Sequence, residues 1–231
     1  MKNFYLFFVL SFFYCLNICS QNDAHQWGLF GRYSTQNKEL ASKEMVKGRV
    51  VFMGNSITEN WYSIHPAFFE SNNYIGRGIS GQTSYQFLLR FRQDVINLYP
   101  EIVVINAATN DIAENTGAYN EDYTFGNIVS MVELSEAYGI KVILTSTLPA
   151  ACFGWNPSIK DVPLKIKSLN KRIMEYAKGK NIPYVDYYSK LVNQSDGSMI
   201  SQYTNDGVHP VSEGYLVMED LINTVIKQLL N

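Results

Sequence analysis

The sequence predicts a three-layer α/β/α sandwich built on about five parallel strands. Short runs of β-branched and apolar residues alternate with longer segments whose apolar residues recur every three or four positions, which is the pattern of β-α-β units. The composition, 46% hydrophobic and 17% charged over 231 residues, is that of one globular domain and excludes a disordered, collagen-like or coiled-coil chain. In such folds ligands bind beyond the carboxyl ends of the strands, so that edge is where candidate site residues are sought.

The first 20 residues have the pattern of an export signal. Lys2 precedes an apolar run over residues 4–16, which is too short to cross a bilayer but long enough for the apolar region of a signal peptide. We expect cleavage after Ser20 and a periplasmic or secreted protein. Two alternatives stay open, lipid attachment through Cys19 and retention of the segment as an anchor.

Residues 21–48 are expected to form a helical extension packed on the body of the domain, which covers residues 49–231. The stretch from Trp27 to Met45 is polar and compatible with a single helix. The strands of the body are then expected in five short apolar runs, at residues 49–53, 74–79, 102–106, 141–146 and 183–187.

Helices are expected between these strands. Apolar spacing predicts the first two from Tyr85, Leu88, Leu89, Val95 and Ile96, and from Phe125, Ile128, Val129 and Val132. A third covers residues 164–177, with Gly179 as a stop signal. The last helix has Ser212 as its expected N-cap and an apolar stripe at Met218, Leu221, Ile222, Val225, Ile226 and Leu229.

Two short strings suggest a nucleophile and its base. Ser56 comes just after the first strand in Gly-Asn-Ser-Ile-Thr, where the glycine allows a tight turn that exposes the hydroxyl at the edge of the sheet. Asp206 and His209 lie three residues apart before the last helix, so one turn can supply a base and the carboxylate that orients it. Each string alone is also an ordinary turn or cap.

Two further strings offer hydrogen-bond donors for an oxyanion. Gly81 follows the second strand, and a glycine lets the backbone N–H approach a substrate oxygen. Asn110 follows the third strand and carries a neutral amide donor that tolerates burial. Because all four strings fall at one edge of one sheet, they jointly predict a hydrolytic serine site.

The four strings together resemble the SGNH (GDSL-type) hydrolase superfamily, whose blocks carry Ser, Gly, Asn and Asp-x-x-His in this order. The resemblance spans about residues 50–210 and implies a flavodoxin-like fold and an ester hydrolase that needs no metal or cofactor. Carried over by position, Ser56 is the nucleophile, His209 the general base and Asp206 the residue that orients it. The N–H groups of Ser56 and Gly81 and the side chain of Asn110 form the implied oxyanion hole.

Two positions depart from the family pattern. Asn55 replaces an aspartate of the first block, and because asparagine forms similar turns we expect activity to survive. Ala108 stands where a glycine is usual, which affects the geometry of the oxyanion hole rather than the reaction class. Asp186, at the end of the fifth predicted strand, is a rival to Asp206 as the triad acid.

The strings at residues 78–83 and 89–92 look most similar to the platelet-activating-factor acetylhydrolase-like and carbohydrate acetylesterase branch, which removes short acyl groups. The implied substrate is a small-molecule or glycan ester, and six aromatic residues near the edge could stack on sugar rings: Trp61, Tyr62, Tyr85, Phe153, Trp155 and Tyr203. Alternatives are a lipase, lysophospholipase or thioesterase acting on longer acyl chains and, more remotely, a non-catalytic glycan-binding module.

The charge of the chain argues against nucleic acid as a partner. Lys and Arg number 19 against 21 Asp and Glu, which gives a formal net charge of −2 without a basic run. A flavin carrier is disfavoured because the turn after the first strand is short for a phosphate loop. The oligomeric state stays open.

Overall fold

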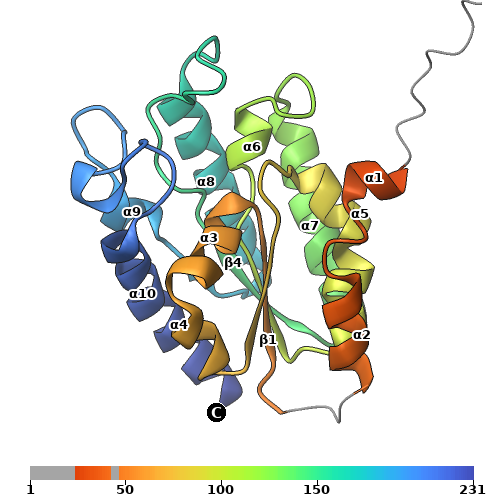
Figure 1. Ribbon diagram of the computed structural model, residues 1–231. Coiled ribbons are helices and arrows are strands. Elements are labelled where there is room, and N and C mark those ends of the chain that lie inside the picture. Colours follow the sequence, from red (N-terminus) through yellow and green to blue (C-terminus); the bar gives the residue numbers. More distant parts are fainter. Residues whose placement is uncertain (1–23, 43–46) are drawn as a thin grey trace, which may run out of the picture.

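A computed structural model describes residues 24–42 and 47–231 of the chain as a three-layer α/β/α sandwich (Figure 1). Its sheet has five parallel strands in the order β2-β1-β3-β4-β5. The strands are β1 (Val50–Gly54), β2 (Tyr74–Gly78), β3 (Ile102–Ile105), β4 (Lys141–Thr145) and β5 (Tyr184–Val185). The predicted fold class is confirmed, and the strands lie where the apolar runs placed them, except that β5 is much shorter.

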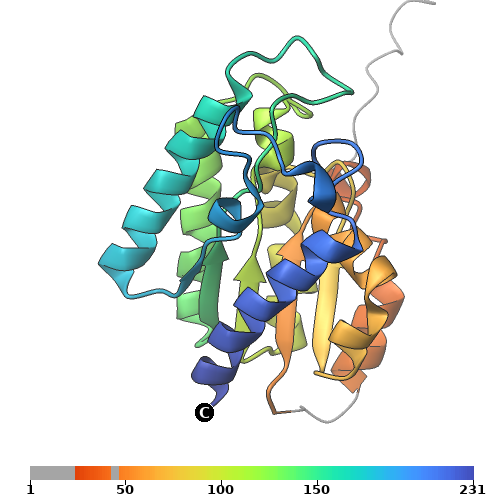
Figure 2. The same ribbon diagram turned by 90° about the vertical axis from the view of Figure 1, so that its left-hand side faces the viewer.

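Side chains of the strands alternate between two apolar cores, one on each face of the sheet. Val51 and Met53 of β1 point into one core, and Val50 and Phe52 point into the other. The first core is covered by α5 (Ser84–Asp94), α7 (Glu121–Ala137) and α8 (Val162–Lys180). The second is covered by α3 (Ser56–Ile64), α4 (Pro66–Glu70) and α10 (Ser212–Leu230), and Figure 2 shows α10 crossing in front of the sheet. Because both faces are covered, the central strands β1 and β3 are continuously apolar, whereas β2 contains Arg77.

The short elements lie in the connections: α6 (Thr109–Ile112) and α9 (Tyr188–Leu191), and the 3₁₀ turns Ile96–Leu98 and Ser201–Tyr203. The chain leaves β5 early because Tyr187 already has helical backbone angles and leads into α9. Helix α8 continues past Gly179 and ends at Asn181, which takes the left-handed conformation instead.

Helix α5 buries a different face from the one that its apolar spacing predicts. Phe87 and Phe91 are fully buried, whereas Leu89 of the predicted stripe is exposed. The buried face of this helix also carries polar residues, among them Arg90 and Asp94, which form an ion pair at 2.9 Å. Because the buried face includes polar residues, the spacing of the apolar residues alone does not identify which face of α5 is buried.

The N-terminal segment, residues 24–42, forms two helices rather than the single one expected. These are α1 (Ala24–Gly28) and α2 (Ser34–Ser42), which lie beside α5 in Figure 1. Leu29, with φ of 52°, breaks the helix between them because an L-residue in the left-handed region cannot continue it. The predicted signal peptide lies outside the described residues. Within the ranges 24–42 and 47–231, no helix has the length and apolar character needed to cross a membrane.

Candidate active site

Ser56 is the first residue of α3 and directly follows the turn that leaves β1. Asn55 caps the helix, since its Oδ1 accepts a hydrogen bond from the N–H of Ile57 at 3.0 Å. Gly54 is required here because a Cβ at this position would lie 2.0 Å from Oγ1 of Thr58. The turn therefore packs tightly against α3 and fixes Ser56 at the carboxyl edge of the sheet.

Ser56, His209 and Asp206 form a continuous hydrogen-bonded chain. Oγ of Ser56 lies 2.8 Å from Nε2 of His209, and Nδ1 of His209 lies 2.6 Å from Oδ2 of Asp206. Oδ1 of Asp206 accepts the backbone N–H groups of Val208 at 2.9 Å and of His209 at 2.8 Å. One carboxylate thus closes the turn and orients the imidazole that the turn carries.

Asp206 is ionised at neutral pH. Partial burial alone raises its pKa, but hydrogen bonds from the backbone and the ring of His209 and from the N–H of Val208 outweigh that effect and bring the pKa to about 2. A carboxylate in this place favours the imidazole tautomer with its proton on Nδ1. Nε2 of His209 is then free to accept the proton of Ser56.

Gly81 lies in the loop after β2, with φ of +78° and no atom within 4 Å of the place that a Cβ would take. Among the residues that the structure describes, neither its N–H nor that of Ser56 donates a hydrogen bond. Asn110 is buried, and its Nδ2 donates to the carbonyl oxygen of Gln82 at 3.0 Å. A primary amide has two N–H bonds, so Asn110 retains one donor.

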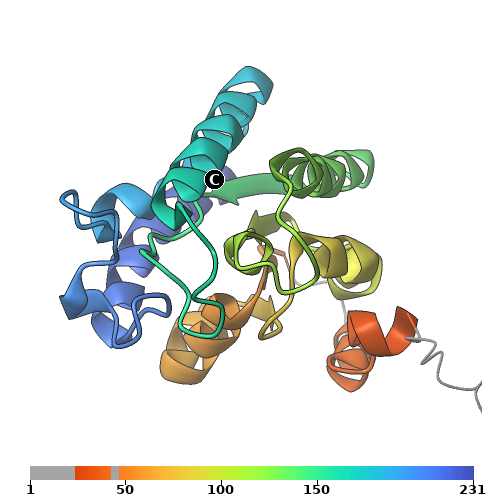
Figure 3. The ribbon, with the colours of Figure 1, turned by 90° about the horizontal axis from the view of Figure 1, so that it is seen from above.

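These residues meet in one open hollow of about 380 Å³ at the carboxyl edge of the sheet. Figure 3 looks down on this edge, where the connecting loops gather. The residues that line it are Ser56, Asn60, Ser80, Gly81, Asn110, Asn115, Trp155 and His209. Asp206 stands behind His209. The structure therefore brings together all five residues that the sequence singled out, although they come from four separate segments.

Trp155 and Asn115 extend the site beyond what the strings predict. Nε1 of Trp155 donates to Oδ1 of Asn115 at 2.9 Å, and Nδ2 of Asn115 donates to the carbonyl oxygen of Gly81 at 3.0 Å. The half-exposed Trp155 ring has its centroid 6.3 Å from that of His209. Nothing in the sequence around Asn115 marks it, because its role depends on contacts with two distant segments.

Of the six aromatic residues expected near the edge, Trp155 is the one that lines the hollow. Trp61 and Phe153 are buried in the apolar cores, and Tyr62 lines a different cavity. Tyr85 and Tyr203 are not among the lining residues. Of the six, Trp155 is therefore the one whose position in the described structure suits stacking on a sugar ring.

The departures from the family pattern have local structural consequences. Ala108 has φ of 85°, a left-handed conformation in which a glycine would be unstrained. In the described part of the chain, the buried Nδ2 of Asn55 finds no hydrogen-bond partner. Asp186, which precedes α9, accepts the N–H of Ser189 in its first turn at 3.0 Å and does not line the hollow.

Asp111 ties the Asn110 segment to α5. Its buried carboxylate accepts the N–H of Ser84 at 3.0 Å and the hydroxyl of the same residue. Burial raises the pKa of Asp111, and the hydrogen bonds from Ser84 and Thr124 oppose that shift.

As for metals, the described ranges hold no group of three or more His, Cys, Asp or Glu side chains that could bind an ion.

Comparison with known proteins finds solved structures of the same fold. A candidate acylhydrolase of Bacteroides fragilis is 66% identical, with a TM-score of 0.87 over 89% of this chain and 99% of its own. A GDSL-like lipase of Bacteroides thetaiotaomicron is 62% identical, with a TM-score of 0.86 over 87% of this chain and 98% of its own. The acetylxylan esterase Axe2 of Geobacillus stearothermophilus, at 17% identity and a TM-score of 0.62, covers 80% of this chain and 96% of its own and shares the fold.

The chain spans only about two fifths of the length of the curated relatives that it matches. The model of the GDSL-like Lipase/Acylhydrolase family matches residues 52–217, a range that runs from within β1 into α10 and contains every residue of the hollow. The resemblance inferred from the four strings is thereby confirmed, and the chain belongs to the GDSL-like lipase/acylhydrolase family.

Proposed function

We propose that this protein is a serine esterase that removes short acyl groups, acetyl above all, from carbohydrate esters. The observation that carries the proposal is the hydrogen-bonded chain from Ser56 through His209 to Asp206. Beside it lie the backbone N–H groups of Ser56 and Gly81, for which the described part of the chain supplies no acceptor. A hydroxyl, a base and an oxyanion site within one hollow are the parts that acyl transfer requires.

In the proposed reaction, Oγ of Ser56 attacks the ester carbonyl while Nε2 of His209 takes its proton. The N–H groups of Ser56 and Gly81 and the Asn110 amide stabilise the oxyanion of the tetrahedral intermediate. His209 then protonates the leaving alcohol, and an acyl-enzyme remains. Water activated by the same histidine attacks the acyl carbonyl, and collapse of the second tetrahedral intermediate releases the acid and restores Ser56.

The lining of the hollow favours a short acyl group and a polar alcohol. Apart from Trp155, the described residues that line it are polar or glycine, and none of them is an aliphatic side chain of the kind that lines a tunnel for a long acyl chain. Asn60 and Asn115 supply amide groups that suit sugar hydroxyls, and the half-exposed Trp155 ring supplies one flat face for a sugar. These features support a carbohydrate ester rather than a lipid.

The test compares p-nitrophenyl acetate, butyrate and octanoate as substrates of the protein without residues 1–20 and of its Ser56→Ala variant. We expect acetate to be hydrolysed fastest, with activity lost in Ser56→Ala. Release of acetate from acetylated xylo-oligosaccharides then tests the carbohydrate step. Faster hydrolysis of octanoate would replace the proposal with a lipase, and equal rates for parent and Ser56→Ala would remove Ser56 as the nucleophile.

We also infer that the protein is exported, on the strength of the apolar run at residues 4–16. Amino-terminal sequencing of the protein from its host distinguishes the two modes of processing. A first residue of Gln21 supports signal cleavage, whereas a lipid-modified Cys19 indicates a lipoprotein.

A further inference from the structure

The loop that carries Gly81, residues 79–82, is held from outside the hollow. No atom lies within 4 Å of the place that a Cβ of Gly81 would take, so side-chain packing does not fix this residue. Asn115 holds its carbonyl oxygen from the hollow, and the orientation of its N–H also depends on the two residues beside it. Those neighbours are Ser80 and Gln82, and hydrogen bonds connect each of them to the N-terminal segment, residues 24–42.

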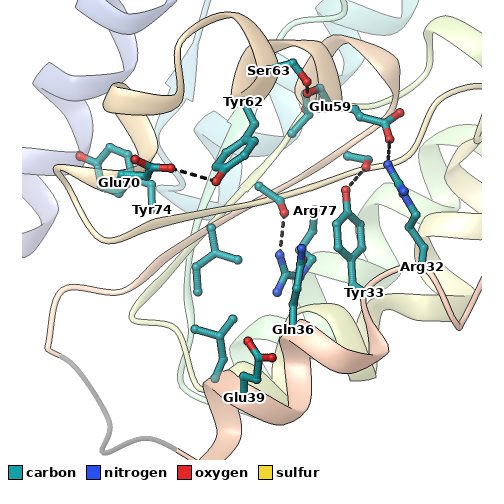
Figure 4. Close-up of a pocket in the computed structure, with 15 residues that line it drawn as sticks. Arg32, Tyr33, Gln36, Glu39, Glu59, Tyr62, Ser63, Glu70, Tyr74 and Arg77 are labelled. Carbon is teal, nitrogen blue, oxygen red and sulfur yellow. Dashed lines mark hydrogen bonds and ion pairs between the residues drawn. The ribbon is translucent and has the colours of Figure 1, made fainter.

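Ser80 is held through Glu59, which lies one turn after Ser56 on α3. Oε2 of Glu59 accepts the backbone N–H of Ser80 at 2.8 Å and also its hydroxyl. Oε1 of the same carboxylate pairs with Arg32 of the N-terminal segment at 2.6 Å. Figure 4 shows Arg32 reaching Glu59, and both residues line a cavity of about 420 Å³ whose other lining residues come mostly from α2, α3 and β2.

Glu59 is well suited to this bridging position because it is charged. Partial burial alone raises its pKa, but the hydrogen bonds from Ser80 and Arg32 outweigh that effect and leave the pKa below its usual value. Charge-assisted hydrogen bonds are stronger than neutral ones. The carboxylate therefore restrains Ser80 more firmly than a neutral side chain would.

Gln82 is held on the other side of Gly81. Its Nε2 donates to the carbonyl oxygen of Gly28 in α1 at 3.0 Å, and its Oε1 accepts from Nε of Arg90 at 2.6 Å. The carbonyl oxygen of Gln82 in turn accepts the hydrogen bond from Asn110. One buried residue thus links α1 to two of the three proposed oxyanion donors.

Arg90 completes the connection to the nucleophile. Its fully buried guanidinium donates to the carbonyl oxygen of Gly54, just before Ser56, at 3.1 Å and to that of Arg77 at 2.9 Å. Tyr33 of the N-terminal segment donates to the carbonyl oxygen of Gly78, where the loop begins. The end of β1, the loop and the N-terminal segment therefore form one polar network.

We propose that the N-terminal segment positions the oxyanion hole, with Glu59 as the positioning residue that transmits its hold to Gly81. This inference rests on the proposed esterase function. It assigns no chemical step to Glu59, which acts through the conformation of residues 79–82. The segment that precedes the sheet is then part of the functional unit rather than an appendage.

The kinetic test compares Glu59→Ala and Glu59→Gln with the parent on p-nitrophenyl acetate. Misplacing one oxyanion donor in Glu59→Ala should lower kcat by about 10- to 100-fold with KM nearly unchanged. Glu59→Gln keeps an oxygen for Ser80 and should recover most of that loss. A boronic acid that forms a tetrahedral adduct with Ser56 should bind more weakly to Glu59→Ala in proportion to its loss of kcat/KM.

Glu70→Ala is the matched control. Glu70 lines the same cavity, and its Oε1 accepts a hydrogen bond from the hydroxyl of Tyr62 at 3.1 Å. Because Glu70 has no hydrogen bond to residues 79–82, its removal should leave kcat at the parent value. Arg32→Ala, which removes only the outer ion pair, should lower kcat by about two- to fivefold, since its side chain is half exposed.

Hydrogen–deuterium exchange of a peptide covering residues 79–88 tests the hold on the loop without reference to activity. Faster exchange in Glu59→Ala but not in Glu70→Ala, together with the loss of kcat, supports the inference. Faster exchange with an unchanged kcat, or unchanged exchange, overturns it. An inactive parent with loop exchange that still depends on Glu59 would instead show that the esterase proposal has failed.

Discussion

Replacing Asp206 with asparagine changes one atom of the proposed triad and keeps the turn around it. Oδ1 of Asp206 accepts two backbone N–H groups, whereas Oδ2 faces Nδ1 of His209. An asparagine has a single side-chain oxygen, and the backbone donors of the turn require it. We therefore expect the oxygen to stay in the turn and the new amide nitrogen to face the imidazole.

The facing amide nitrogen should lower kcat by reversing the tautomer of His209. An N–H₂ group donates but does not accept, so Nδ1 of His209 becomes the acceptor and the ring proton moves to Nε2. Nε2 lies 2.8 Å from Oγ of Ser56 and can then no longer accept its proton. We expect kcat to fall by about 10³- to 10⁴-fold, close to the loss produced by the same change in a serine protease triad. The KM should change little.

The assay measures kcat and KM for the parent, Asp206→Asn and the control Asp186→Asn on p-nitrophenyl acetate. Asp186, the rival triad acid, precedes α9 and does not line the hollow, so its substitution should keep the parent kcat. A loss of less than about tenfold in Asp206→Asn would refute the tautomer argument. A large loss confined to Asp186→Asn would transfer the role of orienting acid to that residue.

Three further predictions concern residues in or beside the hollow. Trp155→Ala should raise KM for acetylated xylo-oligosaccharides by about fivefold, the effect of losing roughly 1 kcal/mol of stacking, with KM for p-nitrophenyl acetate much less affected; equal effects on both substrates would contradict a sugar contact. The pKa of Asp206 is about 2 in the folded protein and near 4 in the unfolded chain, so its ionised carboxylate stabilises the fold above pH 4, and this contribution is lost as the pH falls towards 2. After allowance for solvent screening, thermal unfolding at a series of pH values should show a contribution of about 1 kcal/mol, and Asp206→Asn should lack it. Ala108→Val should lower the free energy of unfolding by about 2 kcal/mol or more because a β-branched residue is strained at positive φ, whereas Ala108→Gly should stay within about 1 kcal/mol of the parent in a urea titration.

The parts of the fold that the sequence predicts well are those determined by local patterns. The central strands β1 and β3 are buried on both faces, so their apolar runs are continuous and their positions are nearly correct. Ser56, Gly81 and Asn110 could be found because each lies next to the end of such a strand. Asp206 and His209 could be found because their interaction spans only three residues.

The remaining features depend on contacts between segments that are far apart in the chain. Trp155 and Asn115 are 40 residues apart, and Glu59 and Ser80 are 21 apart, so no short string reveals either pair. On α5 the buried Arg90 takes a place that an apolar pattern assigns to the surface. Its burial is stable because Asp94, Gln82 and two carbonyl oxygens accept hydrogen bonds from its three nitrogens. Asp94 lies at i+4 on the same helix, but the other partners lie outside α5 and are not predictable from helical spacing.

The two halves of the candidate site differ in burial, and this difference predicts different responses to substitution. Asp206 and His209 lie on a partly exposed turn, whereas Gln82 and Arg90 are buried. Gln82→Leu would leave the carbonyl oxygen of Gly28 and Nε of Arg90 without their partner, at a cost of about 1–3 kcal/mol per buried group.

We therefore expect Gln82→Leu to lower both the melting temperature and kcat. Asp206→Asn should lower kcat strongly and stability only by the about 1 kcal/mol that the ionised carboxylate contributes at neutral pH. Thermal unfolding and steady-state kinetics on the same preparations compare the two variants. An unchanged melting temperature in Gln82→Leu would mean that the network around Arg90 is dispensable for folding. The rigidity of the oxyanion side would then have to come from the packing of α5 on the sheet, through Phe87 and Phe91, rather than from its buried hydrogen bonds.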